Sequence, residues 1–195
     1  MNPYFDTSQV AGVLILVATL CWGSIEASHF GQRRAGATKV GGGGRLMAAW
    51  PFLIAANAVM YLAPHLRPGA AIRPAPVAFG IGLAIMVTGL VLRGWSVRTL
   101  GDYFTGQVAV SADQPVVTAG PYRMLRHPSY TGLLLILSGL GLASANWIGF
   151  AAMALIPLTG ILWRIHAEER ALLTTLGAPY RAYAAQHKRL VPLVW

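Results

Sequence analysis

Stretches of about twenty apolar residues dominate this sequence, and they restrict its fold more than any other feature. A helix needs about 20 mostly apolar residues to cross a bilayer. Three segments of that kind are Val10–Phe30, Leu46–Pro64 and Pro76–Trp95. A fourth stretch, Tyr130–Ile165, has no acidic residue and one basic residue, Arg164, and it is too long for a single crossing. We predict that it breaks at Ser144–Asn146 into a hairpin of two helices.

The composition supports a membrane protein. Apolar residues make up 55% of the 195 residues and charged residues 11%, whereas a soluble domain carries about 25% charged residues. The low charge and many aromatic residues also exclude intrinsic disorder. The sequence therefore predicts an all-α, polytopic membrane protein with five transmembrane helices in a single domain over residues 1–195.

The basic residues indicate how such a protein would be oriented. Lys and Arg collect on the cytoplasmic side of membrane proteins. Thirteen of the 15 fall in residues 31–45, 93–129 and 164–189, which five spans place on one face, and only Arg67 and Arg73 fall on the other. We expect the N-terminus outside and the C-terminus in the cytoplasm. The net charge of +9 then reflects topology and anionic lipid headgroups rather than nucleic-acid binding.

Features near the N-terminus carry weaker signals. The first nine residues contain Asp6 and no Lys or Arg, so we expect the first apolar run to be retained rather than cleaved as a signal peptide. The single cysteine, Cys21, permits no internal disulfide. Residues 41–44 are four glycines without the Lys-Ser/Thr of a phosphate loop, which favours a turn. Glu26 and His29 lie one turn apart near the cytoplasmic end of the first span, where they either act in a site or lie at the interface.

A long polar segment, Ser96–Ser129, is the first place to look for a site, because loops of this length are uncommon unless functional. Pro128 disfavours a helical conformation at His127 and suits the first turn of a helix. His127 should therefore lie at the start of the fourth span, where free backbone N–H groups attract anions. The rings of Tyr122 and Tyr130 beside it can hold a cation such as a sulfonium. Anchoring of the helix at the interface is the alternative reading.

A second polar cluster follows the fifth span. Arg164 and Glu168 are four residues apart and share a helical face. Either they form an exposed ion pair of small energetic value or they belong to a site covered by the amphipathic tail. Apolar and aromatic residues recur in that tail at near-helical spacing: Leu172, Leu173, Leu176, Tyr180 and Tyr183. His166 and Glu169 alone are weak evidence for a metal, and we predict none.

Hydrolase, zincin and nucleotide-hydrolase motifs are missing from the sequence. An ordered series of motifs instead occupies roughly the last 100 residues: Leu100-Gly101, Phe104-Thr105, residues 117–122 (VTAGPY), residues 126–132 (RHPSYTG), Glu168-Glu169 and residues 177–183 (GAPYRAY). This series resembles the isoprenylcysteine carboxyl methyltransferase family, within the membrane methyltransferases that include phospholipid N-methyltransferases. The first two spans carry no motif of this family.

The resemblance implies a catalytic, cofactor-binding core over residues 93–195, preceded by N-terminal spans over residues 1–92. It implies S-adenosylmethionine bound in a cytoplasmic loop under a C-terminal lid helix, and Arg164 at the carboxylate of a lipidic or prenylated substrate. The cofactor would contact Gln107, Gln114, Pro115, Val116, Val117, Tyr122, His127, Pro128, Ser129, Tyr130 and Glu168. The pair Gln114-Pro115 departs from the family pattern.

The chemistry of the acceptor separates the main alternatives. A carboxylate is ionised at neutral pH and needs no general base, whereas an ammonium acceptor must first lose a proton. Arg164 fits a carboxylate, so we predict carboxyl methylation. The alternatives are amine methylation of phosphatidylethanolamine or a related lipid with Glu169 or His127 as the base, a nicotinamide-dependent enzyme resembling sterol reductases, and a non-catalytic membrane protein of the same fold.

Overall fold

The computed structural model describes residues 3–27, 38–39, 50–104, 109–110 and 114–191. Within these residues the protein is almost entirely helical. Two strands of two residues each, β1 (Thr38–Lys39) and β2 (Ala109–Val110), pair in an antiparallel ladder. Apart from this short ladder, all the named elements in the described residues are helices, so the predicted all-α class is confirmed for that part of the chain.

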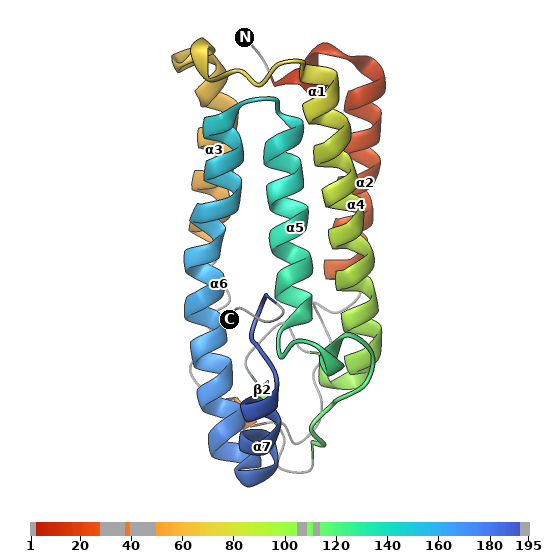
Figure 1. The fold of residues 1–195 in the computed structure, drawn as a ribbon, viewed down its shortest axis with the longest axis vertical. Helices are drawn as coiled ribbons and strands as arrows, with labels where there is room; N and C mark the ends of the chain where they lie inside the picture. The colour runs from red at the N-terminus through yellow and green to blue at the C-terminus, as the bar shows by residue number, and fades with distance from the viewer. Residues whose placement is uncertain (1–2, 28–37, 40–49, 105–108, 111–113, 192–195) are drawn as a thin grey trace.

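Among the described residues, five long helices run up and down the molecule (Figure 1). Their bounds are α2 Gln9–Ala27, α3 Trp50–Leu66, α4 Ala75–Leu100, α5 Pro128–Ala143 and α6 Trp147–Leu176. By length and apolar composition α2, α4 and α6 can cross a membrane, whereas α3 and α5 are shorter apolar helices. The protein is thus an integral membrane protein with three candidate spans. That all five helices cross stays a prediction.

Short elements complete the chain. Helix α1 (Tyr4–Thr7) precedes α2, and the 3-10 turns are η2 (Pro68–Ala70), η3 (Gly101–Tyr103) and η4 (Gly120–Arg123). Helix α7 (Ala178–Gln186) follows α6. Gly177 separates these two helices with φ +60°, a conformation that glycine adopts without the penalty of a Cβ. The amphipathic tail is therefore divided between the end of α6 and α7.

The hairpin turn lies at the predicted residues. Helix α5 ends at Ala143 and α6 begins at Trp147. The side chain of Asn146 caps α6 by accepting hydrogen bonds from the backbone nitrogens of Ile148 (3.0 Å) and Gly149 (3.2 Å), as expected of an N-cap asparagine. The predicted break at Ser144–Asn146 is confirmed.

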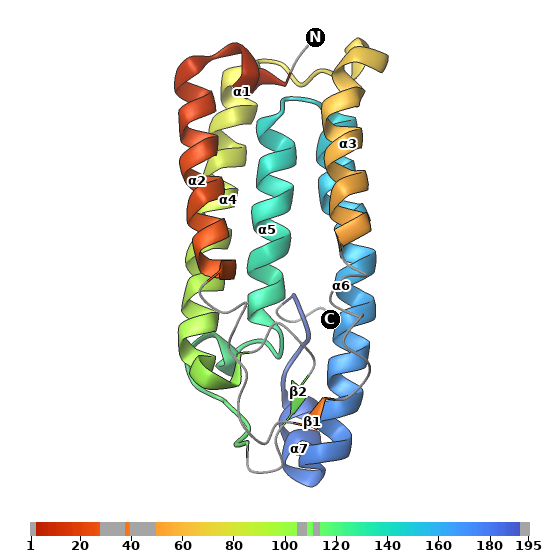
Figure 2. The same cartoon turned by 180° about the vertical axis from the view of Figure 1, so that it is seen from behind.

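Helix α5 is the central element of the bundle. Both views place it between the α2–α4 pair and the α3–α6 pair (Figures 1 and 2), and its most extensive contact is with α4. Glycines let the two backbones meet. A Cβ on Gly139 would lie 2.5 Å from the nitrogen of Met86, and one on Gly89 would lie 2.6 Å from the oxygen of Gly132.

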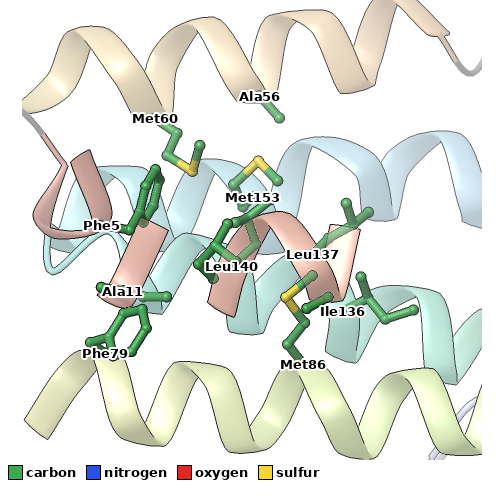
Figure 3. Close-up of a cluster of buried hydrophobic side chains, with 13 residues drawn as sticks. Phe5, Ala11, Ala56, Met60, Phe79, Met86, Ile136, Leu137, Leu140 and Met153 are labelled. Atoms are coloured by element: carbon green, nitrogen blue, oxygen red, sulfur yellow. The ribbon is translucent and has the colours of Figure 1, made fainter. Parts of the chain in front are cut away.

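The apolar core fills the half of the bundle away from α7. Buried side chains from α1 to α6 meet there, with Met60, Met86, Ile136 and Met153 fully enclosed (Figure 3). Small residues at helix contacts and polarisable methionines are typical of membrane helices, which pack by close fit rather than by exclusion of water. The opposite end, where α4 and α6 finish and α5 begins (Figure 1), carries most of the buried polar and charged residues: Arg93, Ser96, His127, Ser129 and Glu169. We call it the polar end.

Candidate active site

The centre of the polar end is the hydroxyl of Tyr130, in the first turn of α5. It accepts a hydrogen bond from Nε of Arg164 at 2.6 Å and donates one to Oε2 of Glu168 at 2.8 Å. The Arg164 guanidinium also lies 5.8 Å from the centre of the Tyr130 ring. Arg164 and Glu168 do share one face of α6, as the spacing predicted, but Tyr130 bridges them in place of a simple exposed ion pair.

The two carboxylate oxygens of Glu168 differ in their contacts. Tyr130 occupies Oε2, and no residue in the described part of the chain hydrogen-bonds to Oε1. Its side chain is partly exposed. A carboxylate in this position can accept a hydrogen bond from a cationic group of a ligand.

Glu169, the next residue, is used differently. It is buried, and three cationic or ionisable side chains surround it. Oε1 lies 2.7 Å from Nη1 of Arg126 and 3.3 Å from Nε2 of His127, and Oε2 accepts from Nε of Arg189 at 2.9 Å. Glu169 therefore joins the loop before α5 to the C-terminal end of the described chain.

Backbone pairing strengthens that junction. The nitrogens of Arg126 and His127 donate to the oxygens of Lys188 (2.8 Å) and Arg189 (3.0 Å). The hydroxyl of Thr131 donates to the oxygen of Leu190 at 2.8 Å. We call residues 187–191 the C-terminal segment; it runs beside the start of α5.

Tyr122 and Tyr183 connect η4 with α7. The buried Tyr183 hydroxyl donates to the oxygens of Tyr122 (2.7 Å) and Leu125 (3.2 Å). Burial, followed by the fields of Glu168 and Tyr130, raises the pKa of the Tyr122 hydroxyl well above its usual range. Tyr122 therefore lies close enough to Glu168 and Tyr130 to interact with both of them.

His127 and Pro128 occupy the positions expected at the start of α5. Pro128 is the first helical residue, and the ring of His127 lies 5.8 Å from that of Tyr130. His127, Pro128 and Ser129 are all buried. The structure thus gathers Tyr122, His127–Tyr130, Arg164 and Glu168 at one end of the bundle.

Other predicted residues are not joined to this group. Gln107, His29 and the glycines 41–44 lie outside the described residues. Gln114, Pro115, Val116 and Val117 lie in an irregular stretch before η4, partly or fully exposed. No hydrogen bond within the described residues links these four to Tyr130 or Glu168. Their contact with a cofactor stays a prediction.

His166 and Glu169, the two residues considered for a metal, differ in their surroundings. His166 is exposed and its Nδ1 lies 2.7 Å from the oxygen of Leu162, whereas Glu169 is buried among arginines. Within the part of the chain that the structure describes, no three His, Cys, Asp or Glu side chains form a group suited to a metal.

Several organising residues were missed by sequence reasoning. Arg126 and Arg189 hold Glu169, and Arg93 anchors the start of α5. Arg93 lies near the end of an apolar run, and a charge at that depth is itself a signal of a buried partner. The hydroxyl of Tyr180 is buried with no hydrogen-bond partner within the described residues. Its pKa is raised by burial and then by Glu169 and Glu168.

Comparison with known proteins finds a match to one family over residues 81–174 of the chain. Residues 81–174 match the isoprenylcysteine carboxyl methyltransferase (ICMT) family, so the resemblance inferred from the motifs is confirmed. The match starts earlier than the motif series and ends before residues 177–183.

Individual relatives agree with this assignment. The chain is 32% identical over 115 residues to protein-S-isoprenylcysteine O-methyltransferase B of Arabidopsis thaliana, covering 58% of each protein. It is 33% identical over 116 residues to protein-S-isoprenylcysteine O-methyltransferase of Tribolium castaneum, covering 58% of this chain and 41% of that protein. The chain therefore spans about half the length of these relatives.

A solved structure shares the fold. The eukaryotic intramembrane Ras methyltransferase ICMT superposes with a TM-score of 0.63 and 26% sequence identity. The match covers 76% of this chain and 53% of that one. The helical arrangement of the bundle is thus that of a known intramembrane enzyme.

Proposed function

From the membership of residues 81–174 in the isoprenylcysteine carboxyl methyltransferase family, we propose that this protein is a membrane methyltransferase. It transfers a methyl group from S-adenosylmethionine to the carboxylate of an isoprenylcysteine-like lipidic substrate. The observation that supports this most is the Tyr130 hydroxyl, which joins a guanidinium to a carboxylate at the polar end of an apolar bundle.

Arg164 is the acceptor-binding residue in this proposal. Its guanidinium can hold a carboxylate through paired N–H groups, and Tyr130 fixes its orientation. The substrate carboxylate is already ionised at neutral pH, so the reaction needs no general base. Orienting the nucleophile in this way can supply up to roughly 7–11 kcal/mol of the barrier.

The residues present suit the methyl donor. S-adenosylmethionine, when bound, supplies an electrophilic methyl group on a sulfonium. Tyr122 and Tyr130 offer aromatic faces for such a cation, and Oε1 of Glu168 can accept from an ammonium. The buried hydroxyl of Tyr180, which has no hydrogen-bond partner among the described residues, is a further polar group that a ligand could satisfy. His127, Pro128, Ser129, Gln107 and residues 114–117 complete the proposed cofactor set.

The membrane arrangement follows from helix lengths and charge. Helix α6 has 30 residues, about 45 Å at 1.5 Å per residue, so it exceeds the bilayer core of about 30 Å and its last turns extend into water. Helices α3 and α5, with 17 and 16 residues, lie near the lower limit for a crossing. We propose that all five cross, with the N-terminus outside and the polar end cytoplasmic.

The charge asymmetry and α7 support that arrangement. Arg67 and Arg73 lie between α3 and α4, at the end away from the site, whereas the basic residues that follow α4 and α6 lie at the site end (Figure 1). Helix α7 and the C-terminal segment lie at the site end too and would act as the proposed lid. The prenyl chain would stay in lipid while its carboxylate reaches Arg164.

Amine methylation is less well supported by the geometry. That reaction needs a proton acceptor, and the two candidates for it are Glu169 and His127. Glu169 is neutralised by two arginines and hydrogen-bonded to His127. Neither side chain is therefore placed to remove a proton from an incoming ammonium.

A labelled methyl-transfer assay tests the proposal. The full-length protein, reconstituted in lipid nanodiscs, would be given labelled S-adenosylmethionine and a panel of acceptors: an S-farnesylcysteine analogue, its C-terminal amide and phosphatidylethanolamine. We expect a base-labile methyl ester on the first acceptor and none on the other two. Labelling of phosphatidylethanolamine alone would establish the amine route. Absence of S-adenosylmethionine binding would favour a reductase-like or non-catalytic protein.

A further inference from the structure

Helix α2 contributes a carboxylate to the polar end although it lies outside the family match, which begins at residue 81. Oε1 of Glu26 accepts hydrogen bonds from Nε of Arg93 at 2.5 Å and from Nε1 of Trp22 at 2.8 Å. Glu26 is the only carboxylate that pairs with Arg93 within the described residues. The link spans 67 positions of sequence and joins α2 to α4.

Arg93 in turn fixes the start of α5. It is buried, with 5% of its surface exposed. Nη1 donates to the backbone oxygen of Ser129 at 3.0 Å and to its hydroxyl at 2.9 Å. The backbones also meet here, because a Cβ on Gly132 would lie 2.8 Å from the nitrogen of Arg93. Arg93 therefore has little freedom to move relative to α5.

Ser129 immediately precedes Tyr130, whose hydroxyl contacts both Arg164 and Glu168. A continuous series of contacts thus runs from Glu26 through Arg93 and Ser129 to the residues assigned to acceptor and donor. A buried guanidinium that lost its carboxylate would be strongly destabilised in its present position.

We infer that Glu26 is a positioning residue for methyl transfer: by neutralising and orienting Arg93, it sets the place of Tyr130 between Arg164 and Glu168. This inference rests on the proposed function. It assigns to the first span a role that neither the family match nor the motif series indicates. Tyr130 contacts both Glu168, assigned to the methyl donor, and Arg164, assigned to the acceptor. Displacement of Tyr130 should therefore change the alignment of the two ligands more than it changes the affinity for either ligand.

The test compares Glu26→Gln with Glu26→Asp and with Ser24→Ala, an exposed position on the same helix. Glutamine keeps the size and an acceptor oxygen but removes the charge, whereas aspartate keeps the charge. We expect Glu26→Gln to lower kcat by about 10- to 100-fold, since small misplacements of reacting groups have effects of that order. The acceptor KM and the Kd for S-adenosylmethionine should change by less than about threefold. Glu26→Asp should recover part of the rate, and Ser24→Ala should match the wild type.

Hydrogen exchange of the backbone amides of residues 128–135 gives a readout that does not depend on activity. Faster exchange in Glu26→Gln, but not in Ser24→Ala, is expected if Glu26 orders the start of α5. Faster exchange in Glu26→Gln together with a wild-type kcat would show that Glu26 has only a structural role and would overturn the inference. Unchanged exchange in this variant would also overturn it. A wild-type protein that methylates no acceptor would refute the proposed function, while the exchange data would still decide whether Glu26 acts on α5.

Discussion

Helices α4 and α5 meet in two regions that are built in opposite ways. Along most of their length the contact is made by glycines and apolar side chains, with backbone atoms in near contact at Gly82, Gly89 and Gly139. At the site end the same two helices are joined by the guanidinium of Arg93 on Ser129. We call the first region the glycine seam; the second belongs to the polar end.

The difference shows how one helix pair serves both stability and chemistry. In an apolar environment, close fit sets the distance between helices, and small residues permit it. Charged hydrogen bonds add direction but require complete pairing when buried. The seam therefore fixes where α5 lies, and the polar end fixes where Tyr130 points. Changes at the polar end should affect activity first, and changes in the seam should affect stability first.

The largest effect is expected at Arg164. Arg164→Ala removes the group proposed to hold the acceptor carboxylate, and we expect kcat/KM to fall by at least about 100-fold, in line with the loss of a charged contact to reacting atoms. The unfolding temperature in detergent should change little. The matched control is Arg170→Ala, an exposed arginine on the same helix, which should retain activity. Wild-type activity in Arg164→Ala would disprove its assigned role.

A smaller effect is expected at Glu168, and it should appear in the binding of the methyl donor. Glu168→Gln removes a charged acceptor worth about 1.5–3 kcal/mol, so we expect the Kd for S-adenosylmethionine to rise by about 10- to 100-fold. Isothermal titration in detergent would measure it. The exposed Thr174→Ala serves as the control. Unchanged affinity would separate Glu168 from the cofactor and leave it as a partner of Tyr130 only.

The glycine seam should respond in stability rather than in ligand affinity. Gly139→Ala places a methyl group 2.5 Å from the nitrogen of Met86, and overpacking of this kind costs about 1–3 kcal/mol. Gly80→Ala is the control, because a Cβ there meets nothing within 4 Å and alanine favours a helix. Thermal unfolding in detergent should fall for the first variant and stay level or rise for the second. Equal behaviour of the two would mean that the seam is not tightly packed.

The sequence was sufficient to predict local features and insufficient for distant pairings. The break at Ser144–Asn146 could be predicted because a small polar run interrupts an apolar one, and Pro128 marks a helix start through its own ring. The face shared by Arg164 and Glu168 follows from a spacing of four. Each of these depends on neighbours in sequence alone.

The contacts that could not be predicted from the sequence all join residues far apart in the chain. Glu26 meets Arg93 across 67 positions, and Arg189 meets Glu169 after the chain has turned at Gly177. Nothing in the order of residues specifies which helix faces these charges. Glu26 could only be described as a functional or interfacial residue until the packing of α2 against α4 was known. Such pairings depend on tertiary packing, which periodicity does not encode.

The smallest effect is expected at Tyr183, which joins α7 to the polar end. Tyr183→Phe leaves the buried oxygens of Tyr122 and Leu125 without this donor, so we expect a loss of about 0.5–1.5 kcal/mol in stability near pH 7.

This loss should depend on pH. Burial, opposed by the field of Arg126, raises the pKa of Tyr183 to about 12. In the unfolded chain a tyrosine ionises near pH 10. Between those pH values the unfolded wild type releases a proton that the folded protein retains, so wild-type stability falls as the pH rises. Phenylalanine has no such proton, and the stability difference between the two proteins should therefore shrink above pH 10. Denaturant unfolding at pH 7 and at pH 10.5 would measure both values. A difference that stays constant with pH would show that the hydroxyl is not buried against η4, and α7 would then be only loosely attached to the polar end.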